Sequence, residues 1–292
     1  MFDSPFSKRS LVYASLFSLL ILAFIFLGSY FSDQTKLVFC DVGQGDGAYI
    51  RLKNQFDIVI DAGSDRKMLH CLGKYMPFYD KTIELAIISH PQKDHYGGFI
   101  HILEYYRINQ FWMSKIFNNN RSFNALIKTV RLKEIPIQFP SSLVKKSIAD
   151  GVIQFYWPTN LYFAKNAVSD PNIDPEFLLS GLDLNNFSLI FRLKTNRFST
   201  LFTGDAPPEV LDGLPDQTDI KSKIIKVPHH GSKNGLTVEF LKLAGPTYGV
   251  ISVGNKNSYG HPSAEVLEML EASGVKIRRT DLEGDIVYKL PN

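Results

Sequence analysis

The chain has 292 residues, which is enough for one large α/β domain or two small ones with a substantial buried core. Hydrophobic residues make up 45% and charged residues 21% of it, and this ordinary globular composition excludes a disordered or collagen-like chain. The formal net charge is only +3, which is too weak to indicate a nucleic-acid-binding protein by charge alone.

Residues 11–31 form an uncharged, largely apolar stretch whose helical length matches the ~30 Å hydrocarbon core of a bilayer. Lys8 and Arg9 precede it, so the positive-inside rule places the N-terminus in the cytoplasm. We therefore expect a cytoplasmic tail over 1–10, a single-pass membrane anchor over 11–31 and one domain over 32–292 outside the cytoplasm. A cleaved signal peptide is the alternative, and it would make the protein secreted.

Cys40 and Cys71 are the two cysteines of the chain, and two cannot build a disulfide framework. We expect two buried free thiols, with a single bridge as the alternative.

The remaining sequence alternates short strand-like and helical segments. Residues 95–106 and 263–273 have helical patterns, and 164–181 is predicted to be a loop-rich insertion within the least regular region, 118–183. Strand patterns occur at 36–42, 48–53, 56–60, 85–89, 188–193, 198–203, 223–227 and 248–253. Strands and helices mixed in both halves predict an α/β sandwich.

Polar motifs follow several of these strands directly. His90, Asp94 and His95 offer two imidazoles and a carboxylate within six residues, a set that suits a divalent ion. Alternatively, Asp94 caps a helix and His95 faces water.

Three later motifs are less specific on their own. Asp205 follows the 198–203 segment, where a lone carboxylate is usually a turn or cap residue. The tandem His229-His230 pair is difficult to explain as core packing, although a solvated loop is the alternative. His261 precedes the predicted helix at 263–273 and, as a lone residue, would more often be structural.

Taken in chain order, these motifs form a recognisable set. They are the DVGQGD run at 41–46, IDAG at 60–63, SHPQKDHYGG at 89–98, NNFS at 185–188, TGD at 203–205, HHGS at 229–232 and YGHP at 259–262. Together they resemble the metallo-β-lactamase superfamily and, more narrowly, the hydrolase domain of ComEC competence proteins. The resemblance runs from about residue 36 to 286 and implies an αββα sandwich with a metal site along one edge of its two sheets.

The resemblance also implies roles for individual residues. The implied metal residues are His90, Asp94, His95, Asp205 and His229, with Asp205 as a bridge and His90 in a neighbouring site. Asp61, Gln92, Asn186 and Ser188 would orient the ligands or close the pocket. Asp94, His230 and His261 are the expected catalytic residues, with one of the two histidines protonating the leaving group.

One departure from the superfamily pattern affects the metal. Gln92 stands where the second histidine is usual, and no histidine occurs between His101 and His229 to supply another common ligand. We therefore expect one or two divalent ions, with Mn²⁺ or Zn²⁺ as the candidates.

The expected activity is that of a membrane-anchored phosphodiesterase or nuclease that acts on DNA outside the cytoplasm through a metal-activated water. Lys226 and Lys233 are candidate phosphate contacts. The alternatives are hydrolysis of a lactone, a β-lactam or a nucleotide, or a non-catalytic role in DNA uptake or an envelope complex. One predicted span cannot form a DNA pore, so a separate channel subunit is an expected partner of this otherwise monomeric protein.

Overall fold

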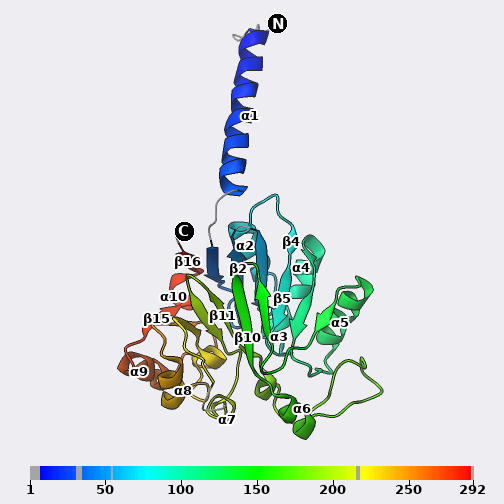
Figure 1. The fold of residues 1–292 in the computed structure, drawn as a ribbon, viewed down its shortest axis with the longest axis vertical. Helices are drawn as coiled ribbons and strands as arrows, with labels where there is room; N and C mark the ends of the chain where they lie inside the picture. The colour runs from blue at the N-terminus through cyan, green and yellow to red at the C-terminus, as the bar shows by residue number, and fades with distance from the viewer. Residues whose placement is uncertain (1–6, 31–34, 54, 215–217, 291–292) are drawn as a thin grey trace.

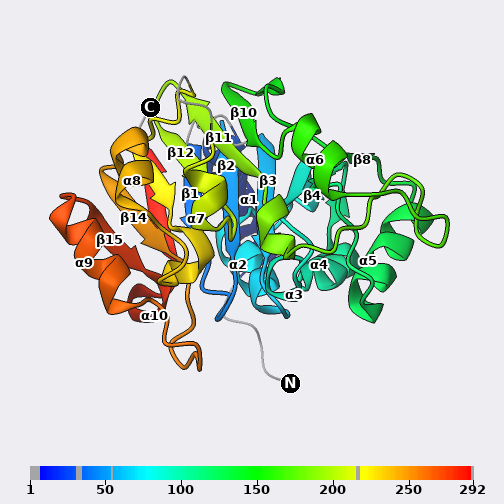
Figure 2. The same ribbon diagram turned by 90° about the horizontal axis from the view of Figure 1, so that it is seen from below.

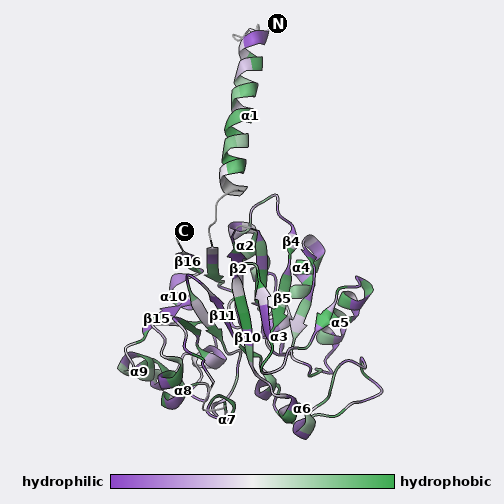
Figure 3. Ribbon diagram, in the orientation of Figure 1, coloured by the Kyte–Doolittle hydropathy of each residue, from purple (hydrophilic) through white to green (hydrophobic). Residues whose placement is uncertain are grey.

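The computed structural model describes residues 7–30, 35–53, 55–214 and 218–290 (Figure 1). The N-terminal helix α1 (Lys8–Tyr30) is long and apolar enough to cross a membrane, by length and composition. Large apolar side chains such as Leu20 and Phe24 are exposed around it, and the ribbon coloured by hydropathy in Figure 3 shows hydrophobic residues along most of the helix. Parts of the three expected segments lie outside the described residues, namely 1–6 of the tail, Phe31 of the anchor and 32–34 of the domain.

Two mixed sheets form the centre of the domain, and each contains seven strands. In spatial order the first sheet consists of β16 (Ile286–Leu290), β1 (Thr35–Phe39), β2 (Gly47–Leu52), β3 (Phe56–Ala62), β5 (Leu85–Ile88), β7 (Phe111–Met113) and β8 (Ile137–Gln138). The second consists of β15 (Lys276–Arg279), β14 (Tyr248–Ile251), β13 (Ile224–Lys226), β12 (Ser199–Phe202), β11 (Ile190–Thr195), β10 (Gly151–Trp157) and β9 (Lys145–Ile148). A small third sheet pairs β4 (Thr82–Ile83) with β6 (Arg107–Ile108).

Helices cover the outer faces of both sheets (Figure 2). The helices are α2 (Lys67–Tyr75), α3 (Lys93–Tyr96), α4 (Phe99–Tyr105), α5 (Arg121–Leu132), α6 (Asn160–Asn166), α7 (Pro208–Leu211), α8 (Val238–Ala244), α9 (Ala264–Ala272) and α10 (Thr280–Glu283), with 3₁₀ turns η1 (Leu184–Phe187) and η2 (Pro228–Gly231). One apolar core joins α2, α4 and α5 to the first sheet, another joins α7, α8 and α9 to the second, and a third fills the space between the sheets. This layering confirms the predicted αββα sandwich.

The strand directions bring the loops of the candidate site together. β1 and β3 are both antiparallel to β2, and β5 is parallel to β3, so β1, β3 and β5 end at the same edge of the first sheet. In the second sheet, β12, β13 and β14 are parallel and also end together. Contact between Lys226 at the end of β13 and Asp46 in the loop after β1 joins the two edges. In Figure 1, α1 extends beyond the opposite end of the sandwich, where β1 begins.

The prediction of one continuous helix over 95–106 is wrong. The structure has two short helices there, α3 and α4, separated by Gly97 and Gly98. A Cβ atom on Gly98 would lie 2.1 Å from the carbonyl oxygen of Ala62, so only glycine permits this approach to the end of β3. In the predicted insertion, α6 extends to Asn166, and 167–183 contains isolated bridges but no regular helix or strand.

The expectation of two free thiols is also wrong. Cys40, just after β1, forms a disulfide with Cys71 on α2, and their Cα atoms lie 5.9 Å apart. Both residues belong to the core between α2 and the first sheet. A separation of 31 residues does not itself indicate proximity, so sequence spacing alone could not distinguish a bridge from two thiols.

We expect reduction of this bridge to destabilise the domain. The chain-entropy model gives about 3–4 kcal/mol for a loop of this length, because the crosslink restricts the unfolded chain. Equilibrium unfolding of the full chain in detergent, with and without dithiothreitol, measures the difference, and thiol titration under denaturing conditions checks the bond. Two titratable thiols in the non-reduced protein would contradict the expected bridge.

Candidate metal centre

Four polar side chains from distant parts of the chain meet at the shared sheet edge. They are Asp94 and His95 on α3, Asp205 in the loop after β12, and His230 in η2. Each offers one potential ligand atom, and these atoms all lie within 4.8 Å of one another. His95, Asp205 and His230 are buried, whereas Asp94 is partly exposed and leaves the cluster accessible from one side.

Asp61, at the end of β3, fixes the orientation of His95. Its Oδ1 accepts from the Ser89 backbone N–H at 2.7 Å, and its Oδ2 lies 2.9 Å from His95 Nδ1 and accepts from the Ser89 hydroxyl at 2.7 Å. Because a carboxylate only accepts, Nδ1 of His95 carries a proton, and Nε2 is the nitrogen that offers its lone pair to the cluster when the ring is neutral. This arrangement is typical of a metal-binding imidazole.

The same tautomer argument applies to two further histidines. His230 Nδ1 lies 3.0 Å from the carbonyl oxygen of Ser252, which can only accept a hydrogen bond. His90 Nδ1 lies 3.1 Å from the Ser89 hydroxyl oxygen, whose single proton already goes to Asp61. Nε2 is therefore the atom of each imidazole that becomes a free acceptor when the ring is neutral, as it is in His90.

The buried nitrogen atoms fit a metal ion. Nε2 of His90, of His95 and of His230 is buried and makes no hydrogen bond to the described part of the protein. Nε2 of His95 and of His230 lies 3.3 Å and 3.2 Å from Asp205 Oδ2. Burial opposes a charge on these two imidazoles, but Asp205 raises the pKa of both well above its usual value, so positive charge is favoured at this point of the site. A divalent cation can replace these protons and satisfy imidazole and carboxylate ligands at once. The His and Asp groups are therefore suited to bind one or two ions.

The electrostatics of the cluster favour charged carboxylates. Burial opposes ionisation of Asp205, but the neighbouring His230 and His95 hold its pKa well below its usual value. Burial likewise opposes ionisation of Asp94, and His95 is the largest influence that lowers its pKa. His90 behaves differently, because burial and the adjacent His95 lower its pKa to about 3. The protein thus provides ionised carboxylates beside a neutral imidazole.

The backbone around the cluster adopts conformations that most residues avoid. Asp61, His229 and His230 have φ angles of 52°, 49° and 53°, in the left-handed region. This region costs non-glycine residues roughly 1–2 kcal/mol each. Left-handed residues are found at functional sites where the surrounding contacts compensate for their strain. The turn of η2 is what directs His230, rather than its neighbour, toward Asp205.

The tandem histidines lie in different surroundings, and the ligand role expected of His229 stays a prediction. His230, expected as a proton donor, lies among the candidate ligands, whereas His229 is half-buried with its ring 6.0 Å from that of His261. His229 instead lines a cavity of about 400 Å³ together with Asn186. His261 is also half-buried, and its backbone N–H donates to Asn257 Oδ1 at 3.0 Å.

The other expected supporting residues occupy distinct places. The Ser188 hydroxyl accepts from the backbone N–H of Asp205 at 3.2 Å, so it supports the loop that carries this carboxylate. The carbonyl oxygen of Asn186 accepts from Trp157 at 2.7 Å. The carbonyl oxygen of Gln92 accepts from the backbone N–H of His95 at 3.0 Å, at the start of α3.

Lys226 is not placed to contact a substrate phosphate. It is 3% exposed, and its ammonium group contacts Asp46, Asp205 and the carbonyl oxygen of Gly204. Burial explains the correction, because all three donors already face protein acceptors. Lys233 is exposed in the loop after His230, and its role as a phosphate contact remains a prediction.

Sequence reasoning missed two residues of this centre. Asp46 Oδ1 lies 3.2 Å from Nδ1 of His230, whereas the sequence motif that contains Asp46 predicts no role for this carboxylate. The Ser89 hydroxyl joins Asp61 to His90. The signals were present, since Asp46 ends the DVGQGD motif and Ser89 precedes the histidine motif, but side-chain direction was needed to interpret them.

We expect His90 to make the metal-free protein acid-labile. In the folded protein the pKa of His90 is about 3, below the ordinary value of 6.5. The folded state therefore keeps its full stability with respect to this group above pH 6.5 and loses stability as the pH falls toward 3, because the unfolded chain binds the proton first. The free energy of unfolding of chelator-treated protein should fall by on the order of 2 kcal/mol between pH 6.5 and 4.5 through this group.

Denaturant unfolding across that range tests this with His90→Gln, which should show a shallower pH dependence. His70→Gln, at an exposed position of α2, is the matched control and should follow the unmodified protein. Parallel curves for all three proteins would rule out this contribution of His90.

No family model matches the chain. Among curated proteins, it is 26% identical over 293 residues to ComE operon protein 3 of Bacillus subtilis, covering 93% of this chain and 35% of that protein. It is 32% identical over 124 residues to competence protein ComA of Neisseria gonorrhoeae, covering 40% of this chain and 18% of that protein. The chain thus spans about a third or less of the length of these relatives.

Solved structures share the fold at low sequence identity. The metallo-β-lactamase fold protein YhfI from Bacillus subtilis matches with a TM-score of 0.52 at 11% identity, covering 88% of this chain and 99% of that one. The diiron β-hydroxylase CmlA from Streptomyces venezuelae matches with a TM-score of 0.55 at 11% identity, covering 89% and 54%. The chain therefore has the metallo-β-lactamase fold, and its sequence is related to that of the competence proteins.

Proposed function

We propose that this protein is a metal-dependent phosphodiesterase that acts on DNA outside the cytoplasm. The observation that carries the proposal is the convergence of buried imidazole nitrogens and carboxylates at one accessible edge of the sandwich. The relatives named for competence favour DNA as the substrate. The fold alone does not choose the reaction, since CmlA is a hydroxylase with the same fold.

In this proposal, Asp94, His95, Asp205 and His230 hold a divalent ion, either Mn²⁺ or Zn²⁺. Such an ion, when bound, lowers the pKa of its water and stabilises charge on a phosphoryl oxygen. Asp61 keeps His95 in the tautomer that this ligand set needs.

His229 and His261 border the cluster and would face a bound phosphodiester. Burial lowers the pKa of both, so each imidazole is neutral near pH 7 and has one N–H to donate. We assign to them hydrogen bonding to the phosphoryl group. The exposed side chain of Tyr259 lies nearly parallel to the ring of His261, with ring centroids 5.8 Å apart.

Two independent features support a location outside the cytoplasm. The Cys40–Cys71 disulfide is typical of oxidising compartments. Lys8 and Arg9 on the other side of the apolar segment favour a cytoplasmic N-terminus. Both features are expected of an anchored domain that meets DNA before it enters the cell, where a separate channel subunit would take over transport.

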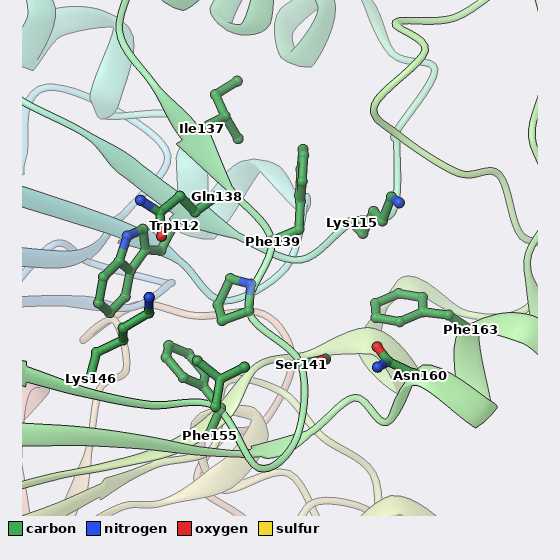
Figure 4. Close-up of a pocket in the computed structure, with 12 residues that line it drawn as sticks. Trp112, Lys115, Ile137, Gln138, Phe139, Ser141, Lys146, Phe155, Asn160 and Phe163 are labelled. Carbon is green, nitrogen blue, oxygen red and sulfur yellow. The ribbon is translucent and has the colours of Figure 1, made fainter.

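A second cavity, of about 490 Å³, supports an anionic, base-containing substrate (Figure 4). It lies at the open side of the sandwich, between β7 and β8 of one sheet and β9 and β10 of the other. Lys115 and Lys146 line it together with Phe139 and Phe163, and its described lining contains no Asp or Glu. Lysines beside aromatic rings are typical of single-stranded nucleic-acid grooves.

One loop both lines this cavity and contacts the segment that carries the candidate metal ligands. Lys115 belongs to the loop after β7, and Asn118 of that loop donates to the carbonyl oxygen of Pro91 at 2.6 Å. Pro91 follows His90 directly. A strand bound along the cavity would therefore lie beside the loop that carries His90 and Asp94.

The activity is tested with full-length protein in detergent, loaded with Mn²⁺ or Zn²⁺. We expect cleavage of single-stranded DNA and of a chromogenic phosphodiester, and a loss of at least about 100-fold in Asp205→Asn and His230→Gln, because loss of residues that merely support ligands already costs 10–100-fold. His70→Gln is the matched control on the surface.

A lactone, a β-lactam and a nucleotide are included as substrates. Cleavage of one of these with both phosphodiesters intact would replace the proposed substrate class. Equal turnover by wild type and the two ligand variants would show that the site is not catalytic.

The cavity is tested separately with the double variant Lys115→Gln/Lys146→Gln. We expect weaker binding of single-stranded DNA and a salt-dependence slope reduced by about 1.4, because each lost phosphate contact on a single strand removes about 0.7. Turnover of the small chromogenic phosphodiester should stay unchanged.

Fluorescence anisotropy of labelled oligonucleotides at several salt concentrations measures the slope. The control is Lys194→Gln/Lys242→Gln, which removes two exposed lysines from β11 and α8. Equal slopes in the two double variants would place the DNA strand elsewhere.

A further inference from the structure

We infer that the ammonium group of Lys226 takes the place of a second metal ion, so that the centre binds one divalent ion per chain. The inference rests on the proposed metal centre and concerns its composition. It assigns to Lys226 a positioning role that differs from contact with substrate.

The contacts of Lys226 are those of a fixed internal cation. Its Nζ lies 3.0 Å from the carbonyl oxygen of Gly204 and 3.4 Å from Asp205 Oδ1, and it forms a close ion pair with Asp46 Oδ2. These three acceptors match the three hydrogens of an ammonium group. Two of them are carboxylates of the kind that a second divalent ion would need.

The two oxygens of Asp205 face different partners as a result. Oδ2 lies 3.3 Å from Nε2 of His95 and 3.2 Å from Nε2 of His230, within the group proposed to bind the metal. Oδ1 faces Lys226 at 3.4 Å. A carboxylate that joins two ions in this geometry would present Oδ1 to the second ion, but here that oxygen faces a cation of the protein.

The second group of potential ligands, Asp46, Asp61 and His95, is already used within the protein. Asp46 Oδ2 pairs with Lys226, and both oxygens of Asp61 accept hydrogen bonds from Ser89. His95 Nδ1 donates to Asp61. These residues therefore hold the first group in place and have little capacity left for an ion.

The space around Lys226 leads to the same conclusion. The cavity that it lines with Asp46, Asp61 and Gly204 has a volume of about 10 Å³. That volume is at the lower limit for a single water molecule. A second ion with its remaining water ligands does not fit unless the ammonium group leaves.

His90 adds one more imidazole beside the cluster. Its Nε2 is buried and makes no hydrogen bond to the described part of the chain. Gln92 occupies the position of the histidine that would accompany it in the usual superfamily pattern. One neutral imidazole is too small a ligand set to hold a second ion against the repulsion of Lys226.

The experiment counts ions in the chelator-treated full chain after reloading with Mn²⁺ and removal of excess metal. Elemental analysis gives the number of ions per chain, and electron paramagnetic resonance separates an isolated Mn²⁺ from an exchange-coupled pair. We expect one ion and an isolated signal in the wild type. Two ions with a coupled signal in the wild type would overturn the inference.

Variants of Lys226 show whether its charge sets this number. Lys226→Met should bind a second ion and produce a coupled signal, whereas Lys226→Arg should still bind one ion. Lys242→Met, on the exposed face of α8, is the matched control and should also bind one ion. A folded Lys226→Met protein that still binds one ion would overturn the role of the ammonium group, and the wild-type count stands as a test if this variant fails to fold.

The count is independent of catalysis. A wild-type chain that binds one ion but cleaves no phosphodiester would contradict the proposed function and support this inference. A chain that binds none would overturn it.

Discussion

The pairing of Lys226 with Asp46 and Asp205 is the constraint on which the arrangement of the site depends. Asp46 follows β1 of the first sheet, whereas Lys226 ends β13 and Asp205 follows β12 in the second, so the ion pairs join the two halves of the sandwich. Buried charges are costly without partners, and removing one partner of such a set typically costs about 3–5 kcal/mol. The two sheet edges therefore cannot separate or slide without exposing uncompensated charge, and this holds the ligands from both sheets in register.

The hydrogen bonds around Asp61 complete this arrangement within the first sheet. Asp61 belongs to the end of β3 and receives both donors of Ser89, which follows β5, as well as Nδ1 of His95. Two parallel strands and α3 are thereby joined through one carboxylate. Burial raises the pKa of Asp61, while the interaction with His95 opposes that rise. The geometry of the imidazole is set by the fold before any ligand binds.

The sequence predicted the sandwich, the apolar helix and the edge where the motifs meet, because strand patterns and polar strand-end motifs depend on local order along the chain. It could not separate His229 from His230, since adjacent residues in a loop exchange roles with a change in backbone φ. It also could not pair Cys40 with Cys71 or bury Lys226, because both depend on contacts between distant segments. The break between α3 and α4 was not predictable for the same reason, because the close contact that requires Gly98 is with Ala62, 36 positions earlier in the chain.

The first strand links the apolar helix, the disulfide and the candidate metal centre. β1 begins at Thr35, near the end of α1, and leads through the disulfide-bonded Cys40 into the loop of Asp46. The candidate metal centre therefore lies at the edge of the sandwich opposite the membrane-spanning candidate (Figure 1). An active site for lipid headgroups would be expected beside the anchor, at the bilayer surface. Placement at the far edge, with lysines and aromatic residues along the adjoining cavity, is compatible with the proposed function, in which a polymer approaches from the aqueous phase.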